Sequence, residues 1–172
     1  MGRLLPLMEP ELGFEMEKIF EQRGIKVATG AKVENIEERA DGTTSTLSGG
    51  EEIAVDRVLI STGRKPNTAD IGLENVGIET DRGFVRVDEG MRTPVDGIYC
   101  IGDANGRCLL AHAASAQGVV AVKNALGEAV ADNLPVPGVV YSYPNAAAVG
   151  LTSAQASEQG IPISVGQFPI GY

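Results

Sequence analysis

Apolar residues near the start of the chain recur at helical spacing. Within residues 9–24, four of them stand at i, i+4, i+7 and i+8: Leu12, Met16, Ile19 and Phe20. This spacing places them on one face and predicts an amphipathic helix. Pro10 suits the first turn of such a helix, and Gly24 suits its C-terminal end.

The next residues, up to position 61, show strand-like patterns. A strand is expected at residues 25–29, followed by a hairpin within 31–47 whose turn is signalled by Asp41-Gly42. After a second turn at Gly49-Gly50, residues 51–61 return and end in an apolar run at 57–61, which predicts a buried strand. The expected order is therefore a helix followed by a β-meander.

The middle of the chain combines a polar linker, two short strands and a helix. Residues 61–77 are rich in Gly and polar side chains, which indicates a linker between buried strands. Residues 83–88 alternate apolar and polar side chains, and residues 98–101 form an apolar run, so each predicts a short strand. An Ala-rich stretch predicts a long, mostly buried helix from about Leu110 to Leu126, with Gly118 marking close packing against another element.

The last part of the chain follows a linker at 127–138 that contains Pro135 and Pro137. The pattern from there to the end predicts a strand, a second strand, a short helix and a third strand. Ser153 is the expected N-cap of the short helix, because its hydroxyl can accept a hydrogen bond from the first turn.

Composition narrows the class of protein. The chain has 172 residues, which fits one domain or pieces of two, and 43% hydrophobic with 22% charged residues is typical of a soluble globular protein. The net charge of −9 argues against a nucleic-acid partner or an anionic membrane surface, and no apolar run approaches the length of a membrane span. The N-terminus makes a poor signal peptide, so a cytoplasmic protein is the default expectation.

The dipeptide Gly102-Asp103 ends the apolar run at 98–101 and is the first candidate for chemistry. Glycine permits close approach of the backbone to another group, and open α/β sheets place ligand contacts at the C-terminal ends of their strands. The alternative is a turn that uses Gly and Asp only for their backbone dihedrals.

Four motifs occur in an order and spacing that resemble the flavoprotein disulfide reductases. They are VLISTGRKPN at 58–67, GFVRVDEGMRTPVDGIYCIGDANG at 83–106, LLAHAASAQG at 109–118 and YPNAAAVGLTSAQASEQG at 143–160. The Leu110-Ala111-His112 stretch is most similar to the dihydrolipoyl dehydrogenase branch of that family. The resemblance implies an α/β fold: a partial two-dinucleotide-binding-domain flavoprotein fold plus the start of an α+β interface (dimerisation) domain.

The resemblance also implies three segments and several missing parts. Residues 1–66 match the C-terminal part of an NAD-binding domain, 67–136 a central segment that contacts FAD, and 137–172 the start of the interface domain. No G-x-G-x-x-G loop is present. Cys100 and Cys108 have seven residues between them, whereas the family's redox pair has four, so both are interpreted as structural. The chain is therefore expected to be an internal fragment, inactive by itself, with no metal site.

Residue roles carry over from the family only where the motifs match. Asp103 would accept a hydrogen bond from a ribityl hydroxyl of FAD, with Gly102 allowing the approach. Ala111 and His112 would open a helix beneath the pyrimidine edge of the flavin, where the positive helix end stabilises negative charge. A second set of residues would contact NAD: Val33, Ser61, Thr62, Gly63 and Arg64. For Arg64 the alternative is a linker charge paired with an acid, and for Val33 it is ordinary sheet packing.

The family's reaction passes electrons from dihydrolipoamide through a protein disulfide and FAD to NAD⁺. No catalytic residue is assigned to this chain, because the family's His-Glu pair is expected beyond Tyr172 and the single histidine, His112, matches another motif. The implied partners are a lipoyl-bearing protein of a 2-oxo acid dehydrogenase or glycine cleavage complex and a second copy in a homodimer, in a bacterial cytoplasm or an organellar matrix. Two alternatives stay open: a non-catalytic remnant that binds a nucleotide or a partner, and another disulfide reductase branch.

Overall fold

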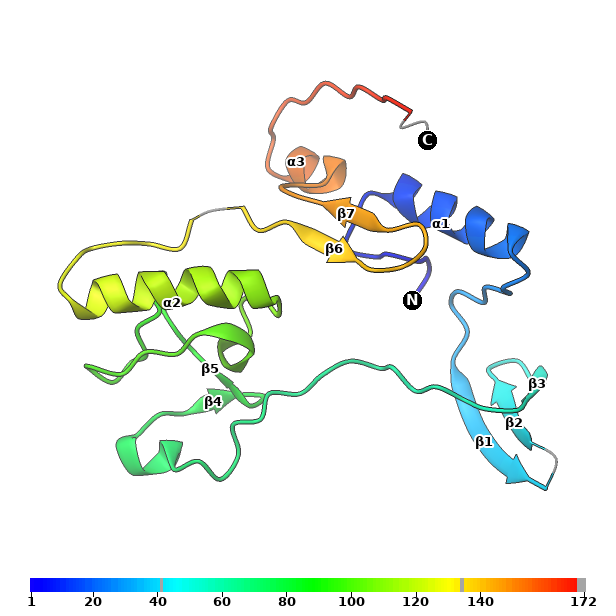
Figure 1. Cartoon of the computed structure of the whole chain (residues 1–172), viewed down its shortest axis with the longest axis horizontal. Coiled ribbons are helices and arrows are strands. Elements are labelled where there is room, and N and C mark those ends of the chain that lie inside the picture. The colour runs from blue at the N-terminus through cyan, green and yellow to red at the C-terminus, as the bar shows by residue number, and fades with distance from the viewer. Residues whose placement is uncertain (41, 134, 170–172) are drawn as a thin grey trace. The chain divides into compact units, whose positions relative to one another are not determined.

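The computed structural model describes residues 1–40, 42–133 and 135–169 (Figure 1). Its contacts divide the chain into two compact units. Unit 1 comprises Met1–Ser61 together with Val139–Tyr172, and unit 2 comprises Thr62–Gly138.

The predicted N-terminal helix is confirmed as α1, Pro10–Gln22, in unit 1. Its inner face carries Met16, which is buried with Met8 and Ala146 in one apolar cluster, and Phe20 packs against that cluster. The buried face of the helix is narrower than predicted, because Leu12 is exposed. Gly13 explains how the N-terminal segment packs here: a Cβ at that position would stand 2.5 Å from the carbonyl oxygen of Leu4.

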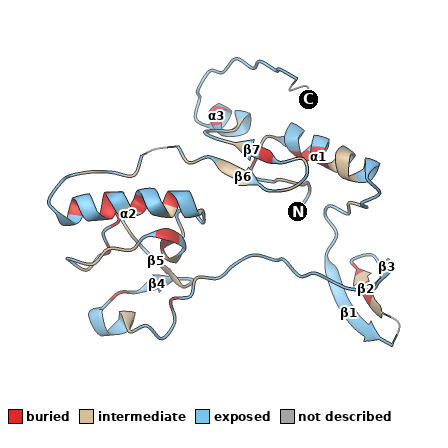
Figure 2. Cartoon of the chain, viewed as in Figure 1, coloured by how far each residue is buried: buried red, intermediate tan, exposed pale blue. Residues whose placement is uncertain are grey.

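The predicted meander is confirmed as a three-stranded antiparallel sheet. It consists of β1 (Val33–Arg39), β2 (Gly42–Leu47) and β3 (Glu52–Val55), with β2 in the centre. Arg39 pairs with Gly42, so the strands reverse at the predicted hairpin turn, although Asp41 of that turn lies outside the described residues. Buried side chains lie only on β2, whereas every residue of β1 and β3 is exposed (Figure 2).

Two predicted strands of unit 1 are wrong. Residues 25–29 and 57–61 form no strand, and the apolar side chains of Leu59 and Ile60 are 90% and 68% exposed. A strand needs a neighbour that pairs with its backbone N–H and C=O groups. None of the described strands pairs with either segment, so an apolar run alone does not produce a strand here.

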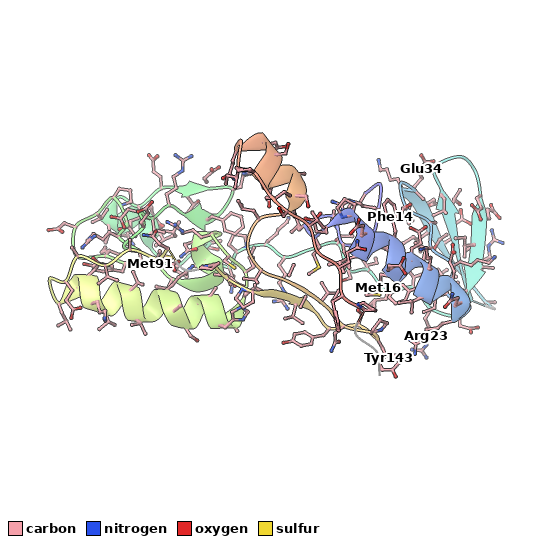
Figure 3. The ribbon with its side chains drawn as sticks, turned by 90° about the horizontal axis from the view of Figure 1, so that it is seen from above. Phe14, Met16, Arg23, Glu34, Met91 and Tyr143 are labelled. Carbon is pink, nitrogen blue, oxygen red and sulfur yellow. The ribbon has the colours of Figure 1, made fainter. Side chains whose placement is uncertain are left out.

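The second half of unit 1 begins with a small sheet of two strands, β6 (Gly138–Val140) and β7 (Ala146–Ala148). The connection between them contains a cis peptide bond before Pro144. Arg23, at the end of α1, donates a hydrogen bond to the carbonyl of Tyr143 and lies 4.5 Å from the centre of its ring (Figure 3). This cation–π contact joins the two parts of the unit.

The short helix is confirmed as α3, Ser153–Glu158, but its predicted N-cap is wrong. Thr152 is the cap: its hydroxyl accepts a hydrogen bond from the backbone N–H of Gln155, whose side chain bonds back to the N–H of Thr152. This capping box satisfies two N–H groups at once. The predicted final strand is also wrong, because residues 161–169 form no regular element.

Ser153 instead contacts Glu9, immediately before α1. One carboxylate oxygen of Glu9 accepts hydrogen bonds from the backbone N–H and, at 2.8 Å, from the hydroxyl of Ser153. These bonds lower the pKa of Glu9, the backbone bond most strongly, because they stabilise the ionised carboxylate. They join the starts of α1 and α3.

Unit 2 contains one long helix and several short elements. In chain order they are the 3-10 turn η1 (Leu73–Val76), the strand pair β4 (Thr80–Asp81) and β5 (Phe84–Val85), the 3-10 turn η2 (Gly102–Asn105) and helix α2 (Ala111–Ala125). The core lies under α2, where Met91 is fully buried against Val120 and Ala121 (Figure 3).

The prediction for α2 is confirmed in its length and wrong in its burial. Ala113 and Val120 face inward, but the apolar residues Val119 and Leu126 are exposed, so only one face of the helix is covered (Figure 2). Gly118 marks no close packing, since a Cβ there would lie an ordinary 3.6 Å from Ile101.

The strands predicted in unit 2 are shorter than expected. The run at 83–88 forms a strand only at β5. The run at 98–101 forms a single bridge, from Tyr99 to Arg92, and is half-buried with Ile101 exposed. The apolar side chains of this second run pack one side of it under α2, and the run is not buried within a sheet.

The Glu9 contact predicts a pH-dependent stability for unit 1. Because the pKa of Glu9 is lowered on folding, its contribution is present above the ordinary carboxylate range and is lost as the pH falls through the folded pKa. Glu9→Gln should therefore lower the stability of unit 1 at neutral pH, and the difference from the wild type should shrink below about pH 4. Urea unfolding at several pH values measures it. Glu11→Gln, the same charge change in the first turn of α1, is the control, and an equal effect of both variants at every pH would contradict the assignment.

Candidate functional site

The turn η2 carries Asp103 and packs closely against α2. Gly102 is buried with φ of +68°, and a Cβ there would stand 3.3 Å from the Cβ of Ala114. Only glycine adopts this left-handed conformation without strain, so both the dihedral and the space require it. The N–H of Gly106 donates to the carbonyl of Asp103 at 3.2 Å and closes the turn. Asp103, which carries the carboxylate, is exposed.

Two buried side-chain amides, one in α2 and one in the turn itself, hold this turn in place, and neither was predicted from the sequence. The side-chain oxygen of Gln117 accepts hydrogen bonds from the backbone N–H of Gly102 at 2.8 Å and from the side-chain amide of Asn105 at 3.0 Å. A signal was present in the sequence. Gln117 follows the buried Ala113 by four residues, so it lies on the apolar face of α2, where an amide needs a hydrogen-bond partner.

The start of α2 is the second half of the candidate site. Ala111 and His112 are exposed in its first turn, and Leu110 provides no side-chain cap. The first N–H groups of a helix have no carbonyl partner within it, and the helix dipole makes this end attractive to negative charge. The Nε2 atom of His112 lies 2.8 Å from the carbonyl oxygen of Pro137, so Nε2 donates this hydrogen bond, which orients the exposed ring.

No described contact joins the remaining predicted residues to the turn η2 or to the start of α2. Val33 begins β1 and Ser61 ends the first part of unit 1, whereas Thr62, Gly63 and Arg64 lie in an exposed, irregular segment of unit 2. The structure therefore groups Gly102, Asp103, Ala111 and His112, all in unit 2. Assignment of Val33 and residues 61–64 to an NAD site stays a prediction.

The cysteines do not form a disulfide. Cys100 and Cys108 are both free and half-buried. Burial raises the pKa of the Cys100 thiol, which disfavours the thiolate that thiol–disulfide exchange requires. Cys100 is therefore suited to packing, as the sequence indicates.

Two family models together match most of the chain. The model of the pyridine nucleotide-disulphide oxidoreductases matches residues 1–118, and the model of their dimerisation domain matches residues 136–171. The chain belongs to the pyridine nucleotide-disulphide oxidoreductase family. These matches confirm the resemblance that the four motifs indicate. The family uses FAD and NAD.

Curated members of this family are similar along nearly the whole chain. The dihydrolipoyl dehydrogenase of Thermus scotoductus is 41% identical over 98% of this chain, and that of Bacillus subtilis is 44% identical over 96%. The chain spans 38% and 37% of the lengths of these two relatives.

Solved structures of the family agree with the fold. LpdA from Mycobacterium tuberculosis has a TM-score of 0.81 and 32% identity over 90% of this chain, which covers 34% of that protein. The HOCl-induced flavoprotein disulfide reductase RclA from Escherichia coli has a TM-score of 0.81 and 30% identity over 91% of this chain, which covers 37% of that protein. The predicted α/β flavoprotein fold class is thus confirmed. Among the described residues, no helix is long and apolar enough to span a membrane.

The fit of Gly102 against α2 predicts the effect of adding one methyl group. Gly102→Ala should destabilise unit 2 by about 1–2 kcal/mol from its left-handed conformation, and further because of the contact with Ala114. Gly97→Ala is the matched control, since Gly97 also has a positive φ but nothing within 4 Å of the added Cβ. Chemical denaturation of both variants measures the difference. Equal losses of stability would show that close packing at Gly102 is unimportant.

Proposed function

We propose that this chain is part of an FAD-dependent dihydrolipoyl dehydrogenase and supplies contacts to the cofactor. The observation that carries the proposal is the exposed Asp103, held on a glycine turn packed against the start of α2. This arrangement lies in a chain that is 41% and 44% identical to two dihydrolipoyl dehydrogenases. The complete protein would oxidise dihydrolipoamide and reduce NAD⁺.

The described residues fit FAD in chemical terms. A carboxylate accepts hydrogen bonds, as Asp103 would from a ribityl hydroxyl, and the first N–H groups of α2 at Ala111 and His112 attract negative charge. When bound, FAD supplies the electron transfer between the redox disulfide and NAD. The chain's own part is to bind and orient: Asp103 holds the ribityl chain, and the start of α2 stabilises charge on the flavin ring.

The proposal assigns no nucleophile or proton-transfer residue to this chain. Cys100 and Cys108 are free, and the pKa of Cys100 is raised. The redox disulfide and the His-Glu pair would come from parts of the protein outside residues 1–172. For NAD, we propose contacts from Val33 and from residues 61–64, of which Arg64 is exposed and charged.

The proposed partners are a second copy of the protein and a lipoyl-bearing protein, as the resemblance to the family implies. A match to a dimerisation domain over residues 136–171 supports a homodimer of the complete protein. Its substrate would be the lipoyl group of a 2-oxo acid dehydrogenase or glycine cleavage complex, in a bacterial cytoplasm or an organellar matrix. We also propose the division into an NAD-domain part at 1–66, an FAD-contacting part at 67–136 and an interface part at 137–172.

One observation favours a second candidate, another branch of the disulfide reductases. RclA, a flavoprotein disulfide reductase, is 30% identical to this chain with a TM-score of 0.81. The two candidates differ in the disulfide or dithiol they act on, so an assay with dihydrolipoamide separates them.

A chimera tests the role of Asp103. This chain would replace the matching region of the Bacillus subtilis relative, with which it is 44% identical. Asp103→Ala in the chimera removes a hydrogen bond to a charged acceptor, worth about 1.5–3 kcal/mol, so the Kd for FAD should rise roughly 10- to 150-fold. Flavin fluorescence during titration of the apoprotein measures it. Asp96→Ala, at another exposed aspartate of unit 2, is the control, and an unchanged Kd in the Asp103 variant would refute the proposed function.

The same chimera tests whether His112 takes part in proton transfer. His112→Gln keeps a side-chain N–H that can donate to Pro137, so kcat for dihydrolipoamide oxidation should stay within about tenfold of the parent. Steady-state kinetics with NAD⁺ measures it. A loss of several orders of magnitude while FAD stays bound would mean that His112 is an acid–base residue after all.

A further inference from the structure

We propose that Gln117 is a positioning residue that fixes Asp103 relative to the start of α2. The inference rests on the proposed function, because it concerns the same FAD contacts. Gln117 does not touch the cofactor in this proposal. It acts through the turn that carries Asp103.

One oxygen atom of Gln117 holds both ends of that turn. The turn η2 begins at Gly102 and ends at Asn105. The Gln117 side-chain oxygen accepts from the backbone N–H of Gly102 at 2.8 Å and from the side-chain amide of Asn105 at 3.0 Å. A carbonyl oxygen has two lone pairs, so these two bonds use its full capacity. Asp103 lies between the two anchored residues.

Because Gln117 is buried, these hydrogen bonds strongly restrict the position of the turn η2. Gln117 is 1% exposed, and Asn105 and Gly102 are buried. Water cannot replace a hydrogen bond lost at such a site, so a buried donor without its acceptor bears the full cost of desolvation. The turn therefore has one favourable position against α2 instead of several.

Gln117 also connects the two halves of the candidate site. It lies on α2 six residues after Ala111, about 9 Å along the helix axis at the usual rise per residue. Because α2 is rigid, an atom fixed to Gln117 is fixed relative to the N–H groups at the start of the helix. A displacement of the turn would move Asp103 away from the hydroxyl it is proposed to hold while the helix end stayed in place.

Asn105 also connects the turn to the core of unit 2. Its side-chain amide also lies 3.2 Å from the carbonyl oxygen of Cys100 and 3.8 Å from the sulfur of Met91, and its side-chain oxygen accepts from the N–H of Arg107 at 2.9 Å. Met91 is the fully buried centre of unit 2. The turn is thus held in place both by α2 and by the core beneath it.

A second buried amide on α2 provides a matched control. Asn124, two turns after Gln117, donates to the carbonyls of Val120 and Val130 and accepts from Arg92. It is buried like Gln117 but has no described bond to η2. A substitution there should disturb the stability of unit 2 without displacing Asp103.

The experiment compares three variants of the chimera in FAD titrations. Gln117→Met keeps the volume and removes the acceptor, so the Kd for FAD should rise about tenfold or more. Gln117→Glu keeps an acceptor at the same reach and should bring the Kd back to within about threefold of the parent. Asn124→Met should leave the Kd within about threefold although it lowers the unfolding midpoint.

Amide hydrogen exchange in the 172-residue chain gives a readout that needs no cofactor. In Gln117→Met the N–H of Gly102 should exchange about tenfold faster than in the wild type, relative to amides in the middle of α2, whereas Asn124→Met should leave that ratio unchanged. If Gln117→Met does not fold, Gln117→Asn replaces it, since the shorter amide stays polar but withdraws its oxygen from Gly102.

The outcomes separate this inference from the proposed function. If Asp103→Ala weakens FAD binding and the acceptor-removing Gln117 variant does not, the positioning role is overturned and the proposed function stands. If Asp103→Ala has no effect, the proposed function fails and the positioning role for FAD fails with it. If Asn124→Met weakens FAD binding as much as Gln117→Met, the effect is general destabilisation and the inference is also overturned.

Discussion

Gly102 lies so close to α2 that a Cβ in its place would stand 3.3 Å from the Cβ of Ala114. This contact brings the turn η2 within reach of Gln117, whose buried oxygen accepts the N–H of Gly102. The grouping of the residues proposed to contact FAD depends on it, because it sets Asp103 beside a helix that begins with Ala111 and His112. Loss of the close packing would leave the same residues in the chain without a common site.

Unit 1 is held in a different way, by contacts between segments far apart in the sequence. Met16 on α1 is buried with Ala146 on β7, Arg23 stacks on Tyr143, and Glu9 accepts hydrogen bonds from Ser153. These contacts join residues 1–24 to residues 138–158. The apolar cluster supplies the burial, and the polar contacts define which segments meet.

The chain's similarity to dihydrolipoyl dehydrogenases and its limited share of their length lead to one interpretation of the site. A cofactor held by a turn and a helix end in unit 2 would need further contacts from elsewhere in the protein. The proposed role of this chain is correspondingly limited to geometry and electrostatics at the flavin. The redox chemistry itself belongs to the cofactor and to residues that this chain does not supply.

Periodicity and turn chemistry determined the local elements of this protein. The spacing of Met16 and Phe20 predicted α1, the Ala-rich stretch predicted α2, and the Asp-Gly and Gly-Gly pairs predicted the meander, because each of these signals acts between near neighbours. The motifs were also sufficient to predict the family. What pairing between distant segments decides could not be predicted in this way: residues 25–29 and 57–61 form no strand. The cap of α3 is a different case, because the box of Thr152 and Gln155 is a local pattern that the sequence does contain.

Tertiary structure alone decided the candidate site. Asp103 and His112 were named from motifs, but only the fold shows that a glycine contact and two buried amides join their segments. The position of Gln117 on the apolar face of α2 was a signal, but a buried amide is stable only with partners from another segment, and the pattern of α2 does not say which segment supplies them. Strand pairing and buried hydrogen bonds are satisfied between distant parts of a chain, so the sequence specifies the groups and the fold determines which of them meet.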